Sequence, residues 1–139
     1  MILDRLARGT PGLLVTLPIK TTNPLNGQTG NSRVASVIRS RARAEQHATA
    51  FMLVAAALKM RLDLRDGVDR YVVTLTRVSA GTMDTDGLAA SQKGVRDGIA
   101  AALKIDDGDT HRLTFRYEQR KGPQKKHSVE VLIEEAQGG

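Results

Sequence analysis

The residues best suited to chemistry lie between positions 83 and 109, a stretch with six aspartates in a chain whose formal net charge is +6. They are Asp84, Asp86, Asp97, Asp106, Asp107 and Asp109. Divalent cations such as Mg²⁺ prefer carboxylate oxygens, and a polyanionic substrate requires cations around such a site. Local acid inside a basic protein is therefore typical of a metal site that faces a polyanion.

Asp84 and Asp86 stand two residues apart, just after a predicted strand. If residues 82–86 are still extended, both carboxylates point to the same side. A simpler interpretation makes Asp86 the N-cap of the following helix, with Asp106 and Asp107 as polar turn residues.

The predicted helix over residues 88–103 carries charge on one side. Asp86, Lys93 and Asp97 are 7 and 11 residues apart, so an ideal helix places them within about 20° of one line. The apolar stripe has the same spacing roughly 200° away and consists of Leu88, Val95 and Ile99. The charged side is either a solvated face with a Lys93–Asp97 pair, or a carboxylate cluster beside an ammonium group. Such a cluster can hold one or two Mg²⁺ ions that polarise a phosphate and supply hydroxide, while the lysine stabilises phosphoryl charge.

This arrangement resembles the RusA family of Holliday junction resolvases, including RusA-like proteins of phages and prophages. The family pattern is Asp-x-Asp-Asn-Leu, a lysine in the next helix, an aspartate four residues later, and an Asp-Asp pair after the helix. The matching residues here are Asp84-Thr85-Asp86-Gly87-Leu88, Lys93 with Asp97, and Asp106-Asp107. The stretch Phe115-Arg116-Tyr117-Glu118-Gln119 resembles the phage-borne branch. Gly87 stands where the family has Asn, and Lys93 follows Asp86 by seven residues rather than four.

The resemblance implies a homodimeric endodeoxyribonuclease that uses Mg²⁺, or alternatively Mn²⁺, to nick branched DNA during recombination and repair. Asp84, Asp86 and Asp107 would ligate the metal, and Lys93 would assist catalysis. Asp97 and Asp106 would lie behind the metal ligands and help to position them, without binding the metal themselves. The expected location is the cytoplasm of a bacterial host, with a phage or prophage gene as the source.

Two other functions stay open. Gly87 and the displaced Lys93 are compatible with a catalytically weak or silent DNA-binding protein on the same fold. The third possibility is a structural or interaction protein whose aspartates only cap and solvate a helix.

The elements that must position these residues can be predicted from periodicity. Alternation predicts strands over residues 13–19, 71–78, 112–118 and 129–134, and helical spacing predicts helices over 33–62 and 88–103. The order β-α-β-α-β-β favours an α+β fold, a mixed α/β layer. Its sheet would be small, mostly antiparallel or mixed, with the two helices packed on one face.

Composition limits the class of protein. At 139 residues the chain is long enough for one domain over residues 1–139, with 1–12 and 136–139 expected to be flexible. Two Phe, two Tyr and no Trp predict a core of Val, Leu, Ile and Ala, and the absence of Cys excludes disulfides and thiolate chemistry. No apolar run reaches the ~18 residues of a membrane span, and the N-terminus has no signal-peptide pattern.

The basic residues favour a nucleic-acid partner, because the sequence pI is near 10.1. Three groups could flank the site: Lys20, Arg33, Arg39, Arg41 and Arg43; Arg112 and Arg116; and Arg120, Lys121, Lys125 and Lys126. Contacts of this kind position DNA without reading its sequence, which suits structure-selective binding. The scarcity of aromatic residues disfavours a stacking platform for single strands.

Overall fold

The computed structural model describes residues 12–21, 33–59, 70–106, 108–123 and 126–135, with the backbone alone for 33–39. Seven elements follow one another along the chain. They are β1 (Gly12–Leu17), α2 (Arg33–Lys59), β2 (Tyr71–Ser79), α3 (Thr85–Ser91), α4 (Lys93–Leu103), β3 (Leu113–Lys121) and β4 (Ser128–Glu135). The predicted α+β fold is confirmed.

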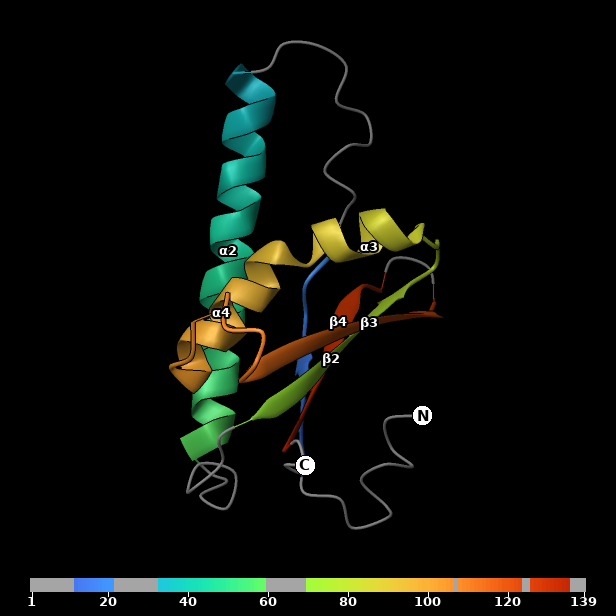
Figure 1. Ribbon diagram of the computed structural model, residues 1–139. Coiled ribbons are helices and arrows are strands. Elements are labelled where there is room, and N and C mark those ends of the chain that lie inside the picture. The colour runs from blue at the N-terminus through green and yellow to red at the C-terminus, as the bar shows by residue number, and fades with distance from the viewer. Residues whose placement is uncertain (1–11, 22–32, 60–69, 107, 124–125, 136–139) are drawn as a thin grey trace.

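The four strands form one mixed sheet in the order β1-β4-β2-β3. β4 pairs antiparallel with both β1 and β2, and β2 pairs parallel with β3. β1, β2 and β3 therefore run in the same direction. Helices α2 and α4 cover one face of the sheet, and α3 lies at the end where β2 stops (Figure 1).

The core lies between the sheet and the two long helices. Each strand alternates, so every second side chain faces the helices. The fully or nearly fully buried aliphatic side chains of this core include Leu17, Val54, Leu58, Val73, Leu75, Val95, Ile99, Leu113, Val129, Val131 and Ile133. The expected core of aliphatic residues is thus observed, with Phe115 and Tyr117 packed at its margin. Arg96 of α4 joins them, with its guanidinium 5.4 Å from the centre of the Phe115 ring and a 3.1 Å hydrogen bond to the Tyr117 hydroxyl.

Helix α4 touches the backbone of α2 through two glycines. A Cβ added to Gly98 would lie 2.5 Å from the carbonyl oxygen of His47 and 2.9 Å from the Cβ of Ala50. At Gly94 the same atom would lie 2.7 Å from the carbonyl oxygen of Arg43. Only residues without a side chain allow the two helices to approach so closely.

The single helix predicted over residues 88–103 is wrong, because the structure contains two helices. Helix α3, capped by Asp84, begins at Thr85, three residues before the expected start, and the chain breaks at Gln92 with φ −98° and ψ 4°. The contact of Gly94 and Gly98 with α2 sets the direction of α4, while α3 must begin where β2 ends. The break at Gln92 separates the two helices, so the charged stripe from Asp86 to Asp97 does not form one continuous line.

Other boundaries differ slightly from expectation. Gly12, expected to be flexible, starts β1, and the third and fourth strands are longer than predicted. Residues 1–11, 60–62 and 136–139 lie outside the described residues. In the part of the chain that the structure describes, no helix has both the length and the hydropathy needed to cross a membrane.

Replacing Gly98 with Ala should lower the free energy of unfolding by about 1–3 kcal/mol, because the new methyl group forces α4 away from α2. This loss exceeds the gain in helix propensity, which is at most about 1 kcal/mol. The matched control is Gly81→Ala, since a Cβ at Gly81 meets nothing within 4 Å. Urea unfolding measures both variants, and equal midpoints would contradict the tight contact.

Candidate functional site

The chain segments that follow β1, β2 and β3 lie at the same end of the sheet, because these three strands are parallel. This edge is formed by the carboxyl ends of these strands. Leu17, Val129 and Arg77 are consecutive partners across β1, β4 and β2, and Gln119 of β3 is the next partner beyond Arg77. The carboxyl ends of parallel strands are where open sheets usually bind their ligands. The first two predicted metal ligands therefore lie at a suitable edge.

Asp84 is the N-cap of α3, so the interpretation of Asp86 as the cap is wrong. The Oδ1 atom of Asp84 accepts a hydrogen bond from the backbone N–H of Gly87 at 2.8 Å. Asp86 lies in the first turn of the helix, which also contradicts an extended segment with both carboxylates on one side. Both side chains are exposed, so a hydrated cation can reach them from solvent.

The segment before Asp84 is held by Gln119, whose role the sequence reasoning missed. The Gln119 amide accepts a hydrogen bond from the backbone N–H of Met83 at 2.9 Å and donates one to the Met83 carbonyl at 2.7 Å. This pair of hydrogen bonds imitates one step of strand pairing and connects the acidic segment to β3. A polar residue in register with Leu113, Phe115 and Tyr117 was the available signal.

Arg77 is a second anchor that was missed. It is buried on the helix-covered face, in line with Val73 and Leu75, and burial lowers the pKa of its guanidinium. Its Nη1 donates to the carbonyl oxygen of Gly81 at 2.8 Å, and its Nε lies 3.5 Å from the carbonyl oxygen of Thr21. Arg77 thereby joins the segment after β1 to the segment that leads into Asp84.

Asp106 and Asp109 lie at the opposite edge. Asp106 accepts a hydrogen bond from the backbone of Gly108 at 3.0 Å, and the Asp109 carbonyl accepts one from Leu113, the first residue of β3. Leu113 pairs with Tyr71 at the start of β2, whereas Asp84 follows the end of that strand. A nine-residue strand spans roughly 26 Å.

One chain therefore does not bring Asp84 and Asp86 together with Asp106, since metal–oxygen bonds are near 2 Å. Among the described residues, no three acidic or histidine side chains form a group that could hold an ion. Asp107 lies outside the described residues. Asp97 is half-buried on α4 rather than part of a solvated face.

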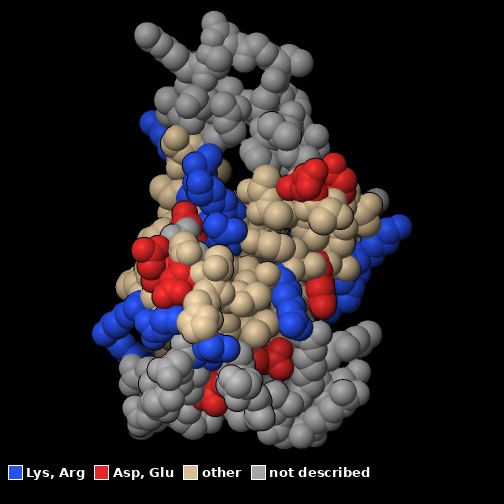
Figure 2. All heavy atoms as spheres, in the orientation of Figure 1, with Lys and Arg blue, Asp and Glu red and all other residues tan. Residues whose placement is uncertain are grey.

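Lys93 begins α4, beyond the break at Gln92, whereas Asp86 lies in the first turn of α3. It is the exposed first residue of α4, next to Gly94 and its contact with Arg43. Ser40, Arg43 and His47 line a shallow hollow of about 430 Å³ on the same part of α2. Figure 2 shows basic side chains along α2 and acidic ones at the start of α3, with uncharged surface between them.

The predicted DNA-binding residues divide by location. Lys20, Lys121 and Lys126 are exposed at the edge that carries Asp84. Exposed Arg116 alternates onto the face of the sheet opposite the helices, and exposed Arg112 lies at the far edge. The side chains of Arg33, Arg39 and Lys125 lie outside the described part of the chain.

Arg120 was predicted to contact DNA, but its guanidinium is engaged by Glu130. It donates to that carboxylate from both Nη atoms, one of them at 3.1 Å, and this hydrogen bonding raises the pKa of Arg120. The pair reaches across the intervening strand β2, because Arg120 is aligned with Val78 and Glu130 with Thr76. Its charge is thus less available to phosphate than that of Lys121.

Comparison with known proteins does not assign the chain to a family. No protein-family profile matches the chain, and no curated protein does. Among solved structures, IspF of Plasmodium falciparum in a CDP complex is similar with a TM-score of 0.32 and 10% identity, covering 75% of this chain. The similar region spans 60% of that protein's chain, and a likeness this weak carries no argument about function.

Replacing Gln119 with Ala should loosen the acidic segment without unfolding the protein. Loss of both amide hydrogen bonds, each worth about 1 kcal/mol, predicts a roughly fivefold or larger rise in hydrogen exchange at the Met83 amide. Arg116→Ala, on the other face of the same strand, is the matched control. NMR-detected exchange separates them, and unchanged protection at Met83 in Gln119→Ala would refute the anchoring role.

Proposed function

We propose that this protein is a metal-dependent endodeoxyribonuclease that acts on branched DNA, as the RusA-like order of its aspartates implies. The observation that carries the proposal is the edge where β1, β2 and β3 end. There Asp84 and Asp86 are exposed, with exposed Lys20 after β1 and exposed Lys121 at the end of β3. Carboxylates flanked by ammonium groups suit a phosphodiester held against a divalent cation.

The chain's own residues would divide the work. Asp84 and Asp86 would hold Mg²⁺ or Mn²⁺, which supplies Lewis-acid activation of the phosphate and a bound hydroxide. The cap bond between Asp84 and Gly87 fixes one carboxylate, and Gln119 fixes the backbone before it. Lys20, Lys121 and Lys126 would bind phosphates on either side of the scissile bond.

We infer that the closing Asp106–Asp107 pair reaches the site from a second copy of the chain. Within one chain β2 separates Asp84 from Asp106, so a site that uses both regions needs two protomers. A two-fold dimer would then contain two such sites, one for each strand of a junction. A phage-encoded protein in a bacterial cytoplasm remains the biological setting that we propose.

A silent DNA-binding protein is the second candidate. Gly87 supplies only a backbone N–H where the family has an asparagine side chain, and Lys93 stands on a different helix from Asp86. These two features favour binding without turnover, and they make cleavage itself the deciding observation.

Cleavage of a synthetic four-way DNA junction tests the proposal. With Mg²⁺ or Mn²⁺, the wild type should give paired nicks, and Asp84→Asn and Asp107→Asn should each reduce the rate by about 100-fold or more. Asparagine is as good an N-cap as aspartate, so Asp84→Asn keeps the helix. Asp109→Asn is the control, because an amide oxygen can still accept the hydrogen bond from the backbone of Arg112.

The outcomes distinguish the three functions. Junction binding without nicks in either metal would replace the nuclease with the silent binding protein. Absence of both binding and nicking would leave a structural or interaction role. If Asp109→Asn lost nicking as completely as the other two variants, removal of any nearby carboxylate would impair the enzyme. Asp84 and Asp107 would then not be singled out as metal ligands.

A further inference from the structure

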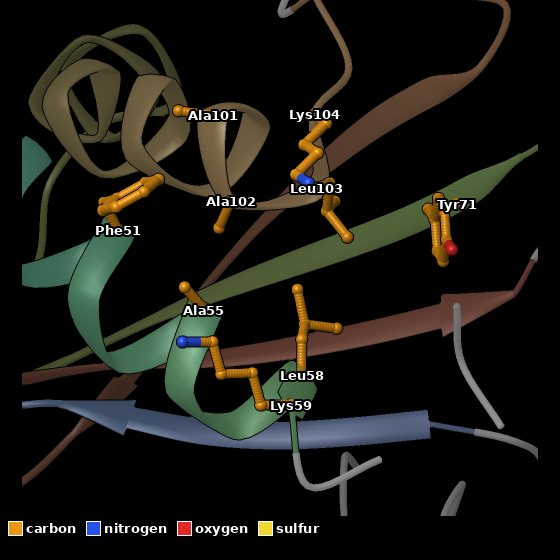
Figure 3. A pocket seen from close by; sticks show the side chains of 9 residues that line it. All are labelled: Phe51, Ala55, Leu58, Lys59, Tyr71, Ala101, Ala102, Leu103 and Lys104. Atoms are coloured by element: carbon orange, nitrogen blue, oxygen red, sulfur yellow. The ribbon is translucent and has the colours of Figure 1, made fainter. Parts of the chain in front are cut away.

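The ends of α2 and α4 enclose an apolar pocket of about 450 Å³ (Figure 3). Its walls come from Phe51, Leu58 and Leu103, and three alanines, Ala55, Ala101 and Ala102, leave the space between them. The cavity is large enough for one aromatic or long aliphatic side chain with part of its backbone.

Apolar surface continues from the pocket along α2. Phe51, Met52 and Leu53 are consecutive, so they point in three directions from the helix. All three are exposed, by 41%, 66% and 37%. Residues 48–58, ATAFMLVAAAL, carry no charge at all. A helical segment that is apolar all round is normally covered, and exposed apolar side chains beside an apolar pocket mark a docking surface.

Charge at the pocket indicates what covers it. Lys59 in the last turn of α2 and Lys104 after α4 are both exposed and line opposite sides of the cavity, as Figure 3 shows. No acidic residue lines the pocket in the described part of the chain. Two ammonium groups outweigh the partial negative charge at the ends of α2 and α4. A ligand with carboxylates around an apolar side chain is complementary to this arrangement.

A second copy of the chain suits the pocket less well. Its formal net charge is +6, and two-fold pairing at this surface would bring the lysines of both copies together. Tyr71 in the wall adds no negative charge, because burial and the nearby Glu135 both raise the pKa of its hydroxyl.

We propose that this pocket docks a short acidic segment of a partner protein, with one large apolar side chain inserted between α2 and α4. The pocket lies at the start of β2, whereas Asp84 follows the end of that strand. Docking would therefore leave Asp84 and Asp86 open, and it would lie beside the Asp106–Asp107 pair that follows Lys104 in the chain. The proposal holds whether or not the chain cleaves DNA.

The test uses the full chain and a fluorescein-labelled peptide, Gly-Asp-Glu-Asp-Phe-Asp-Glu-Gly, in a fluorescence polarisation titration. The double variant Lys59→Glu/Lys104→Glu should weaken binding by about 10-fold or more. The charge-matched control is Lys20→Glu/Lys126→Glu at the other edge of the sheet, with an expected change of less than about 2-fold. A peptide with Ser in place of Phe should bind the wild type about 10-fold more weakly.

A neutral variant separates pocket filling from charge. Ala101 is exposed and lines the cavity, so Ala101→Trp should occupy it and abolish saturable binding while the unfolding temperature stays close to that of the wild type. If this variant fails to fold, the Ser peptide and the two charge variants still decide.

Three results would overturn the proposal. They are no saturable binding of the peptide, equal weakening by the two charge variants, and binding that survives loss of the peptide's Phe. Sedimentation without peptide gives a fourth: a dimer that Ala101→Trp dissociates would make a second copy the occupant.

Discussion

The contact between the backbones of α2 and α4 is the constraint on which the remaining structure depends. Gly94 and Gly98 let α4 lie against the carbonyl oxygens of Arg43 and His47, at distances that no Cβ tolerates. Once α4 is fixed there, its apolar stripe can only face the sheet. The chain must then turn at Gln92 to meet the end of β2, and this turn creates α3 as a separate helix.

The same constraint separates two surfaces of different chemistry. α3 carries its aspartates to the edge where the parallel strands end, and the end of α4 forms an apolar pocket at the edge where they begin. Arg77 and Gln119 stiffen the first edge through bonds to backbone atoms, so its carboxylates stay exposed on a fixed segment. Within one protomer, Asp84 and Asp86 and the apolar pocket therefore lie on separate surfaces.

Periodicity predicted the strands and the aliphatic core well, because the alternation of buried and exposed side chains depends on residues close together in the chain. The turn at Gln92 could not be predicted, since Leu88, Val95 and Ile99 keep one helical spacing across it. Arg120 and Gln119 show the same limit, because their partners lie 10 and 36 residues away. The sequence also placed Asp84 and Asp106 in one motif, while the sheet holds them at opposite edges.

The measurement that tests the central claim most directly mixes two defective proteins. Asp84→Asn and Asp107→Asn, carrying different affinity tags, are combined in equal amounts, and the mixed dimer is isolated and given a four-way junction with Mg²⁺. If each site takes residues from both protomers, every mixed dimer contains one intact site of two, and the unfractionated mixture should recover about a quarter of the wild-type nicking. Inactivity of an isolated mixed dimer would contradict a site shared between two chains.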